Sequence, residues 1–155
     1  MRLFTSCMLL TIVILGSVSG QTASKRSLVA RLKNNAVADG CGCYFQYRGA
    51  PGNRIYYLFF SSIEDEEKTA WMNIEGRDVK LTLAKKTDPR GRVRVGSRST
   101  RRYVADDISV EATYVASKVC PRNDESCEST DYYATLVVRK GAQVQVVKAV
   151  GGCGC

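Results

Sequence analysis

The sequence contains no histidine among its 155 residues. This absence excludes histidine-based catalytic triads, histidine general acid–base catalysis and histidine metal ligands. The chain also lacks an internal repeat and any long stretch with helical periodicity. Any indication of fold and function must therefore come from the short β runs, the cysteines and the charged residues.

The N-terminal apolar stretch is too short to cross a bilayer. Residues 8–15 (MLLTIVIL) follow a single Arg2, and small residues come next. This order is typical of a secretory signal peptide, whereas a membrane-spanning helix needs about 20 apolar residues. We therefore expect residues 1–20 to be a signal peptide, with export to the periplasm or the extracellular space and no membrane span.

Removal of residues 1–20 changes the cysteine count from seven to an even number, because Cys7 is lost. The six that remain are Cys41, Cys43, Cys120, Cys127, Cys153 and Cys155. An even number of cysteines in an exported chain is typical of a disulfide framework. The loss of Arg2 lowers the net charge from +8 to +7, so the exported chain stays basic.

Residues 21–40 are small and polar, and they are expected to form either a flexible leader or one short helix. Ser27 would cap that helix, whose apolar residues would be Leu28, Val29, Leu32, Ala36 and Val37. Residues 41–155 are expected to form a single β domain, because short apolar runs and turn residues alternate there.

The expected strands fall at regular spacing. They cover residues 54–60, 69–75, 79–85, 92–98, 108–116, 132–138 and 144–150, with turns at 76–78, 88–91 and 139–143. In residues 108–116, Ile108, Val110, Ala112 and Tyr114 share one face. The pattern predicts an all-β fold, a small antiparallel sandwich or barrel of about eight strands.

A Cys-Gly-Cys motif stands at each end of this domain, at residues 41–43 and 153–155. If the first and last strands pair antiparallel with Gly42 opposite Gly154, Cys41 faces Cys155 and Cys43 faces Cys153. Two stacked disulfides would then join the ends of the domain and remove an exposed sheet edge.

Two alternatives for these four cysteines remain open. Four thiolates could form a tetrahedral zinc or copper(I) site. One Cys-Gly-Cys could instead act as a redox-active dithiol. For Cys120 and Cys127, which bound a polar segment, we expect a local disulfide, with free thiols as the alternative.

Arginines concentrate in residues 88–102. They are Arg90, Arg92, Arg94, Arg98, Arg101 and Arg102. Planar guanidinium groups bind phosphate and carboxylate in bidentate fashion, so this segment predicts an anion-binding strand whose partner is an anionic polymer or an acidic protein. The alternative is a solvated or internally neutralised strand, with residues 64–67 or Asp106 and Asp107 as counter-charges. A specific nucleic-acid partner is not expected, because no matching fold motif is present.

Carboxylates are numerous, but nothing in their spacing predicts catalysis. Neither Asp106 with Asp107 nor residues 64–67 indicates two groups placed across a cleft. The acidic group at residues 124–131 lacks the spacing of a calcium loop. We therefore expect neither an enzyme nor a bound cofactor.

Two segments, AWMNIEGRDVKLTL and GSRSTRRY, resemble the periplasmic or membrane-bound inhibitors of c-type lysozyme, which are small exported β-barrels. The Ser-Gly order of the family's cleft-entering segment is not reproduced, so the resemblance assigns no site residues. The sequence predicts an exported, non-catalytic, disulfide-stabilised β domain that acts by binding. The alternatives are a thiol or metal protein that uses the Cys-Gly-Cys motifs, and an inhibitor similar to those of lysozyme.

Overall fold

The computed structural model describes residues 27–49, 56–121, 123–124 and 126–155, so the expected signal peptide lies outside the described residues. The described chain forms nine strands and one short 3-10 turn. Their bounds are β1 Val29–Ala30, η1 Asn35–Ala38, β2 Gly42–Tyr47, β3 Phe59–Ser62, β4 Thr69–Ile74, β5 Arg77–Thr87, β6 Arg98–Ala105, β7 Ile108–Lys118, β8 Ser129–Lys140 and β9 Gln143–Gly154.

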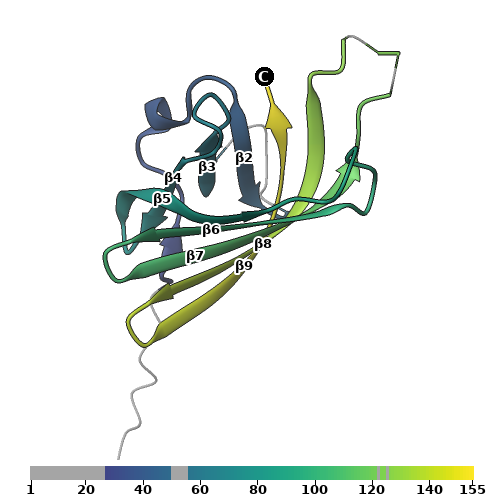
Figure 1. Ribbon diagram of the computed structural model, residues 1–155. Coiled ribbons are helices and arrows are strands. Elements are labelled where there is room, and N and C mark those ends of the chain that lie inside the picture. Colours follow the sequence, from purple (N-terminus) through teal and green to yellow (C-terminus); the bar gives the residue numbers. More distant parts are fainter. Residues whose placement is uncertain (1–26, 50–55, 122, 125) are drawn as a thin grey trace, which may run out of the picture.

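Strands β2 to β9 form a closed antiparallel barrel of eight strands (Figure 1). The order runs β4-β3-β2-β9-β8-β7-β6-β5, and pairing of β5 with β4 closes it. The short β1 pairs with Asn73 and Ile74 at the end of β4, beyond the part of β4 that pairs with β3. The all-β prediction is confirmed, as is the pairing of the first and last strands of the barrel, β2 and β9.

The barrel interior is filled by alternate residues of each strand. Ile108, Val110, Ala112 and Tyr114 of β7 are all buried, as their spacing predicts. The largest enclosed side chains are aromatic, and the rings of Phe45 and Tyr114 stack with centroids 4.8 Å apart. Full burial of one such side chain contributes about 1.5–3 kcal/mol to the free energy of unfolding. The interior side chains are therefore a main source of the barrel's stability.

Of the two alternatives for residues 21–40, a flexible leader or a short helix after Ser27, the helix does not form in the described residues 27–40. Val29 pairs with Ile74 as part of β1, and the side-chain oxygen of Gln145 accepts hydrogen bonds from the backbone N–H groups of Leu28 and Val29. Burial of Leu28 and Val29 in the barrel core outweighs the weak helical pattern. A single 3-10 turn follows, capped by Asn34, which accepts from Ala36 N at 3.1 Å.

The expected strand over residues 54–60 is shorter than predicted. β3 begins at Phe59, and residues 54–55 lie outside the described residues. Tyr57 instead accepts a hydrogen bond through its carbonyl from Leu32 N at 2.8 Å, and the Arg31 guanidinium lies 4.1 Å from the centre of the Tyr56 ring. This stretch therefore packs against residues 31–32, outside the barrel ladder.

Antiparallel pairing brings several connections to one end of the barrel. They are the start of β2, the turn at residues 63–68, the loop at 88–97, the connection at 119–128 and the end of β9. We call this the disulfide end. It carries all six described cysteines and the start of the arginine segment.

Candidate functional site

The two Cys-Gly-Cys motifs meet in the register that the sequence predicts. Gly42 stands opposite Gly154, and disulfides join Cys41 to Cys155 and Cys43 to Cys153. Cys43 is completely buried on the inner face of the barrel. The sulfur atoms are bonded in pairs, so a thiolate metal site or a redox dithiol here would first require reduction.

A third disulfide joins Cys120 to Cys127, with Cα atoms 5.5 Å apart. It closes the polar connection between β7 and β8, as the sequence predicts. The three disulfides together are consistent with an oxidising environment.

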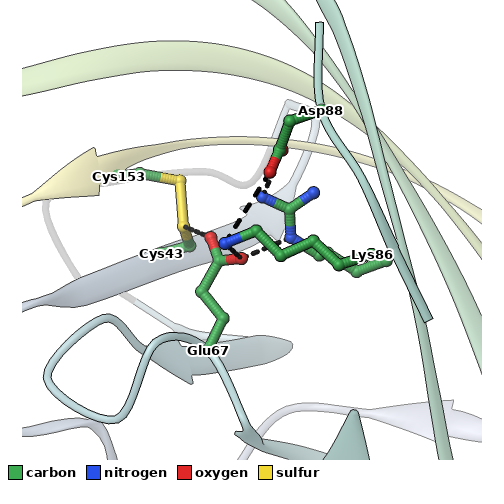
Figure 2. The surroundings of a disulfide bond; sticks show 6 residues. Cys43, Glu67, Lys86, Asp88 and Cys153 are labelled. Atoms are coloured by element: carbon green, nitrogen blue, oxygen red, sulfur yellow. Dashed lines mark hydrogen bonds and ion pairs between the residues drawn. A yellow bond between two sulfur atoms is a disulfide. The ribbon is translucent and has the colours of Figure 1, made fainter. Parts of the chain in front are cut away.

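A group of four charged side chains lies beside the inner disulfide (Figure 2), and of these Glu67 and Arg101 are buried while Lys86 and Asp88 are exposed. One carboxylate oxygen of Glu67 lies 3.7 Å from Cys43 Sγ, and the other forms an ion pair with Arg101 Nε. Lys86 Nζ is 3.1 Å from the second oxygen. Asp88 completes the group by pairing with Arg101 Nη2 at 2.7 Å. Two carboxylates thus face two cations, and the charges balance.

This arrangement favours a structural role over acid–base chemistry. Burial tends to lower the pKa of Arg101, but its hydrogen bonds and ion pairs with Glu67 and Asp88 outweigh burial and raise that pKa. The guanidinium therefore stays charged, and it holds both carboxylates in place. The group anchors the turn at residues 63–68 across the inside of β6.

Two buried tyrosines extend the polar region inward. Burial raises the pKa of Tyr103, and burial likewise raises that of Tyr114, whose side chain is also fully enclosed. Both phenols therefore remain neutral at physiological pH, and neither is prepared to act as a base.

The arginine segment does not form the strand that the sequence predicts over residues 92–98. Arg90, Arg92 and Arg94 lie in a loop, and Val95 beside them is 68% exposed. The reason lies in the backbone. Gly91 and Gly96 adopt φ angles of 77° and 85°, which leave the extended region, and pairing with β7 resumes only at Gly96 N, 2.8 Å from Ala116 O.

The remaining three arginines lie on β6, where alternation separates them. Arg98 and Arg102 point outward and are exposed, while Arg101 points inward and is buried in the charge group. Arg101 therefore does not belong with the exposed arginines. The sequence also offered neutralisation by residues 64–67 as the alternative for this strand. This alternative holds for Arg101, because Glu67 forms an ion pair with it.

The structure adds a feature that sequence reasoning missed. Lys85 of β5 stands opposite Arg102, and the two border an outer hollow of about 290 Å³. The other lining residues are Thr87, Thr100 and Glu111. An irregularity in the ladder between Leu83 and Lys85 sets this register, and no pattern in the sequence indicates it.

Within the described residues, no three cysteine, aspartate or glutamate side chains come together as a metal site. No helix in the same part of the chain has the length and apolar character needed to cross a membrane. Comparison of the chain with protein-family models, with curated proteins and with solved structures finds no match.

Proposed function

We propose that this barrel is an exported, non-catalytic binding protein that holds an anionic polymer or the acidic surface of a protein. The observation that carries the proposal is the exposure of five arginines at and beside the disulfide end. They are Arg90, Arg92, Arg94, Arg98 and Arg102. Of the ion pairs in the described chain, none engages any of the five.

The chemistry of arginine suits this role. Each guanidinium stays protonated and presents donors that match phosphate, sulfate or carboxylate groups. The groups are spread over the loop at residues 88–97 and the outer face of β6, and Lys85 adds a further cation beside Arg102. Such a spread fits an extended anion with repeated charges better than one small anion.

The rest of the molecule supports binding over catalysis and an exported location. Glu67 and Asp88, two carboxylates at the disulfide end, are held by Arg101 and Lys86. Three disulfides fit an oxidising compartment, where candidate partners are envelope or matrix polymers. Of the GSRSTRRY segment, Arg101 and Tyr103 point into the barrel, which leaves little of it for a lysozyme cleft.

The test compares two double variants of equal charge. Arg92→Ala/Arg94→Ala removes two loop cations, and Arg77→Ala/Arg139→Ala removes two exposed cations outside the arginine segment. Binding to heparin and to polyglutamate is measured by titration at several salt concentrations. We expect the loop variant to weaken binding by roughly two- to thirtyfold, since each exposed ion pair contributes up to about 1 kcal/mol.

The expected binding also weakens as salt is raised, because exposed charges are screened. Equal losses in both double variants would show that only net charge matters and would remove the loop from the proposal. Absence of binding to both polyanions by the unmodified protein would overturn it altogether.

A further inference from the structure

A second surface feature at the disulfide end has the opposite electrostatic character. A groove of about 500 Å³ runs along the outer side of β2, β9 and β8. Its lining includes Tyr44, Tyr57, Glu128, Asp131, Gly152 and Gly154, and we call it the glycine groove. Among the described residues that line it there is no lysine or arginine, although the whole chain has a net charge of +8.

The floor of the groove exists because β9 carries glycine there. The ladder places Tyr44, Gly152 and Asp131 side by side on β2, β9 and β8. A Cβ at Gly152 would stand 3.2 Å from Thr130 O and 3.4 Å from the Asp131 carboxylate, which is tight but short of a severe clash. Backbone packing alone therefore does not require this glycine. Its effect is to leave the space between the tyrosine and the carboxylate open.

One wall of the groove is aromatic and held in place. The rings of Tyr44 and Tyr57 lie with centroids 5.0 Å apart, and Tyr44 also packs against Phe60 at 5.0 Å. The Tyr44 hydroxyl donates a hydrogen bond to Gly40 O. The electron-rich faces of tyrosine rings attract cations, and this barrel already stacks Arg31 on Tyr56.

The opposite wall is acidic and fixed by covalent bonds nearby. Glu128 directly follows Cys127, whose disulfide with Cys120 closes the connection, and Asp131 lies two residues into β8. No ion pair found in the described chain engages Glu128 or Asp131. Burial is the main cause of the raised pKa of Tyr44, and the nearby carboxylates of Asp39 and Glu64 raise it further.

We propose that the glycine groove is a binding site for an organic cation, an ammonium or guanidinium group carried by a basic polypeptide or a polyamine. The cation lies above Gly152, between the tyrosine rings and the two carboxylates. The groove volume is within the range of ordinary ligand sites. This site is separate from the exposed arginines and takes a ligand of opposite charge, so it does not rest on the anion-binding proposal.

The experiment measures binding by calorimetric titration at low salt, with three probes. They are a capped tetra-arginine peptide, spermidine and, as a neutral control, a capped tetra-glutamine peptide. We expect one or both cationic probes to bind and the neutral peptide not to bind. Binding of the arginine peptide alone identifies a basic polypeptide as the ligand class, and binding of spermidine identifies the amine itself as sufficient.

Two groove variants and one control variant locate the site. Glu128→Gln/Asp131→Asn should weaken cation binding by at least roughly fivefold, because two short-range charges are lost. Gly152→Ala should also weaken it by filling the floor, with thermal unfolding measured in parallel to verify the fold. Asp106→Asn/Asp107→Asn, which removes two exposed carboxylates at the opposite end of the barrel, should leave binding unchanged.

The proposal is overturned if neither cationic probe binds, or if the control variant weakens binding as much as the groove variants do. Either result leaves the arginine proposal standing, because heparin and polyglutamate test that one. Loss of polyanion binding, in turn, leaves the cation result unaffected.

Discussion

Glu67 and Arg101 form an ion pair inside the barrel, although 34 residues separate them in the sequence. Their side chains are only 10% and 6% exposed, so water contributes little to either charge. Arg101 brings Asp88 into the same group, and Glu67 brings Lys86. The pair therefore joins the turn at residues 63–68 to β6 and to the start of the arginine loop.

Glu67→Gln should lower the free energy of unfolding by about 3 kcal/mol, because breaking one side of a buried pair leaves an under-compensated charge. Urea unfolding at neutral pH measures this effect. Glu66→Gln is the matched control, since Glu66 forms an exposed pair with Lys68 and its loss should cost less than about 1 kcal/mol. Similar losses in the two variants would contradict the structural role given to Glu67.

The two stacked disulfides should show strong non-additivity when they are removed. Cys41–Cys155 and Cys43–Cys153 close almost the same loop, with sequence separations of 114 and 110. Replacing either pair by alanine should cost about 1–2 kcal/mol, while replacing both should cost about 5 kcal/mol, because only then is the long-loop constraint lost. Urea unfolding of the three variants measures this, and a double loss equal to the sum of the single losses would contradict it.

Gly151→Ala should prevent close pairing of β2 with β9. A Cβ at this position would stand 1.7 Å from Tyr44 O, a backbone atom that cannot move without separating the strands. We expect a loss of more than about 3 kcal/mol or failure to fold, measured by thermal unfolding. The neighbouring Gly152→Ala, with its nearest atom at 3.2 Å, should cost much less. Equal effects at the two positions would show that the strands adjust more freely than the packing indicates.

The protein should lose the stabilising contribution of the Asp78 carboxylate in acid. Its carboxylate accepts hydrogen bonds from Lys33 N, Asn34 N and Asn73 Nδ2 at 2.9, 2.8 and 2.6 Å. Burial tends to raise the pKa of Asp78, but these hydrogen bonds outweigh it and lower that pKa below its ordinary value. On acidification, Asp78 is therefore protonated at a higher pH in the unfolded chain than in the folded protein. The contribution of Asp78 is present above about pH 4 and is lost as the pH falls through the lowered pKa.

The measurement for Asp78 is urea unfolding of the unmodified protein and of Asp78→Asn between about pH 6 and pH 2. The stability difference should be largest at the upper end and should shrink toward the lower end. Asp107→Asn, which changes a carboxylate on an exposed turn, is the control variant. A difference that stays constant with pH would exclude the carboxylate as its source.

The sequence predicted the faces of the strands well where alternation is uninterrupted. In β7, buried residues at every second position follow directly from Ile108 to Tyr114, and the pairing of Gly42 with Gly154 follows from the two Cys-Gly-Cys motifs. The alternation in β7 is a local pattern, and the two Cys-Gly-Cys motifs are identical. The two-residue period of a strand and the antiparallel pairing rule are therefore sufficient to predict both features.

The same rule failed at Arg92 and Arg94, because alternation alone cannot exclude a loop. Gly91 and Gly96 take left-handed conformations on either side, and that choice belongs to the loop that joins the adjacent strands β5 and β6. The inward position of Arg101 could have been derived from the buried Tyr103 two residues later. Its pairing with Glu67 could not, because the path of the turn at residues 63–68 is set by packing at long range.

The disulfides between the paired strands β2 and β9 turn most of the domain into a covalent ring. Cys43 and Cys153 are joined through the backbone in one direction and through a disulfide in the other. A protease that cuts once, anywhere between these two residues, therefore opens the ring without releasing a fragment. Two cuts would be needed to release a piece of the barrel. A single break in an exposed loop such as residues 88–97 would therefore leave every strand attached to the same molecule.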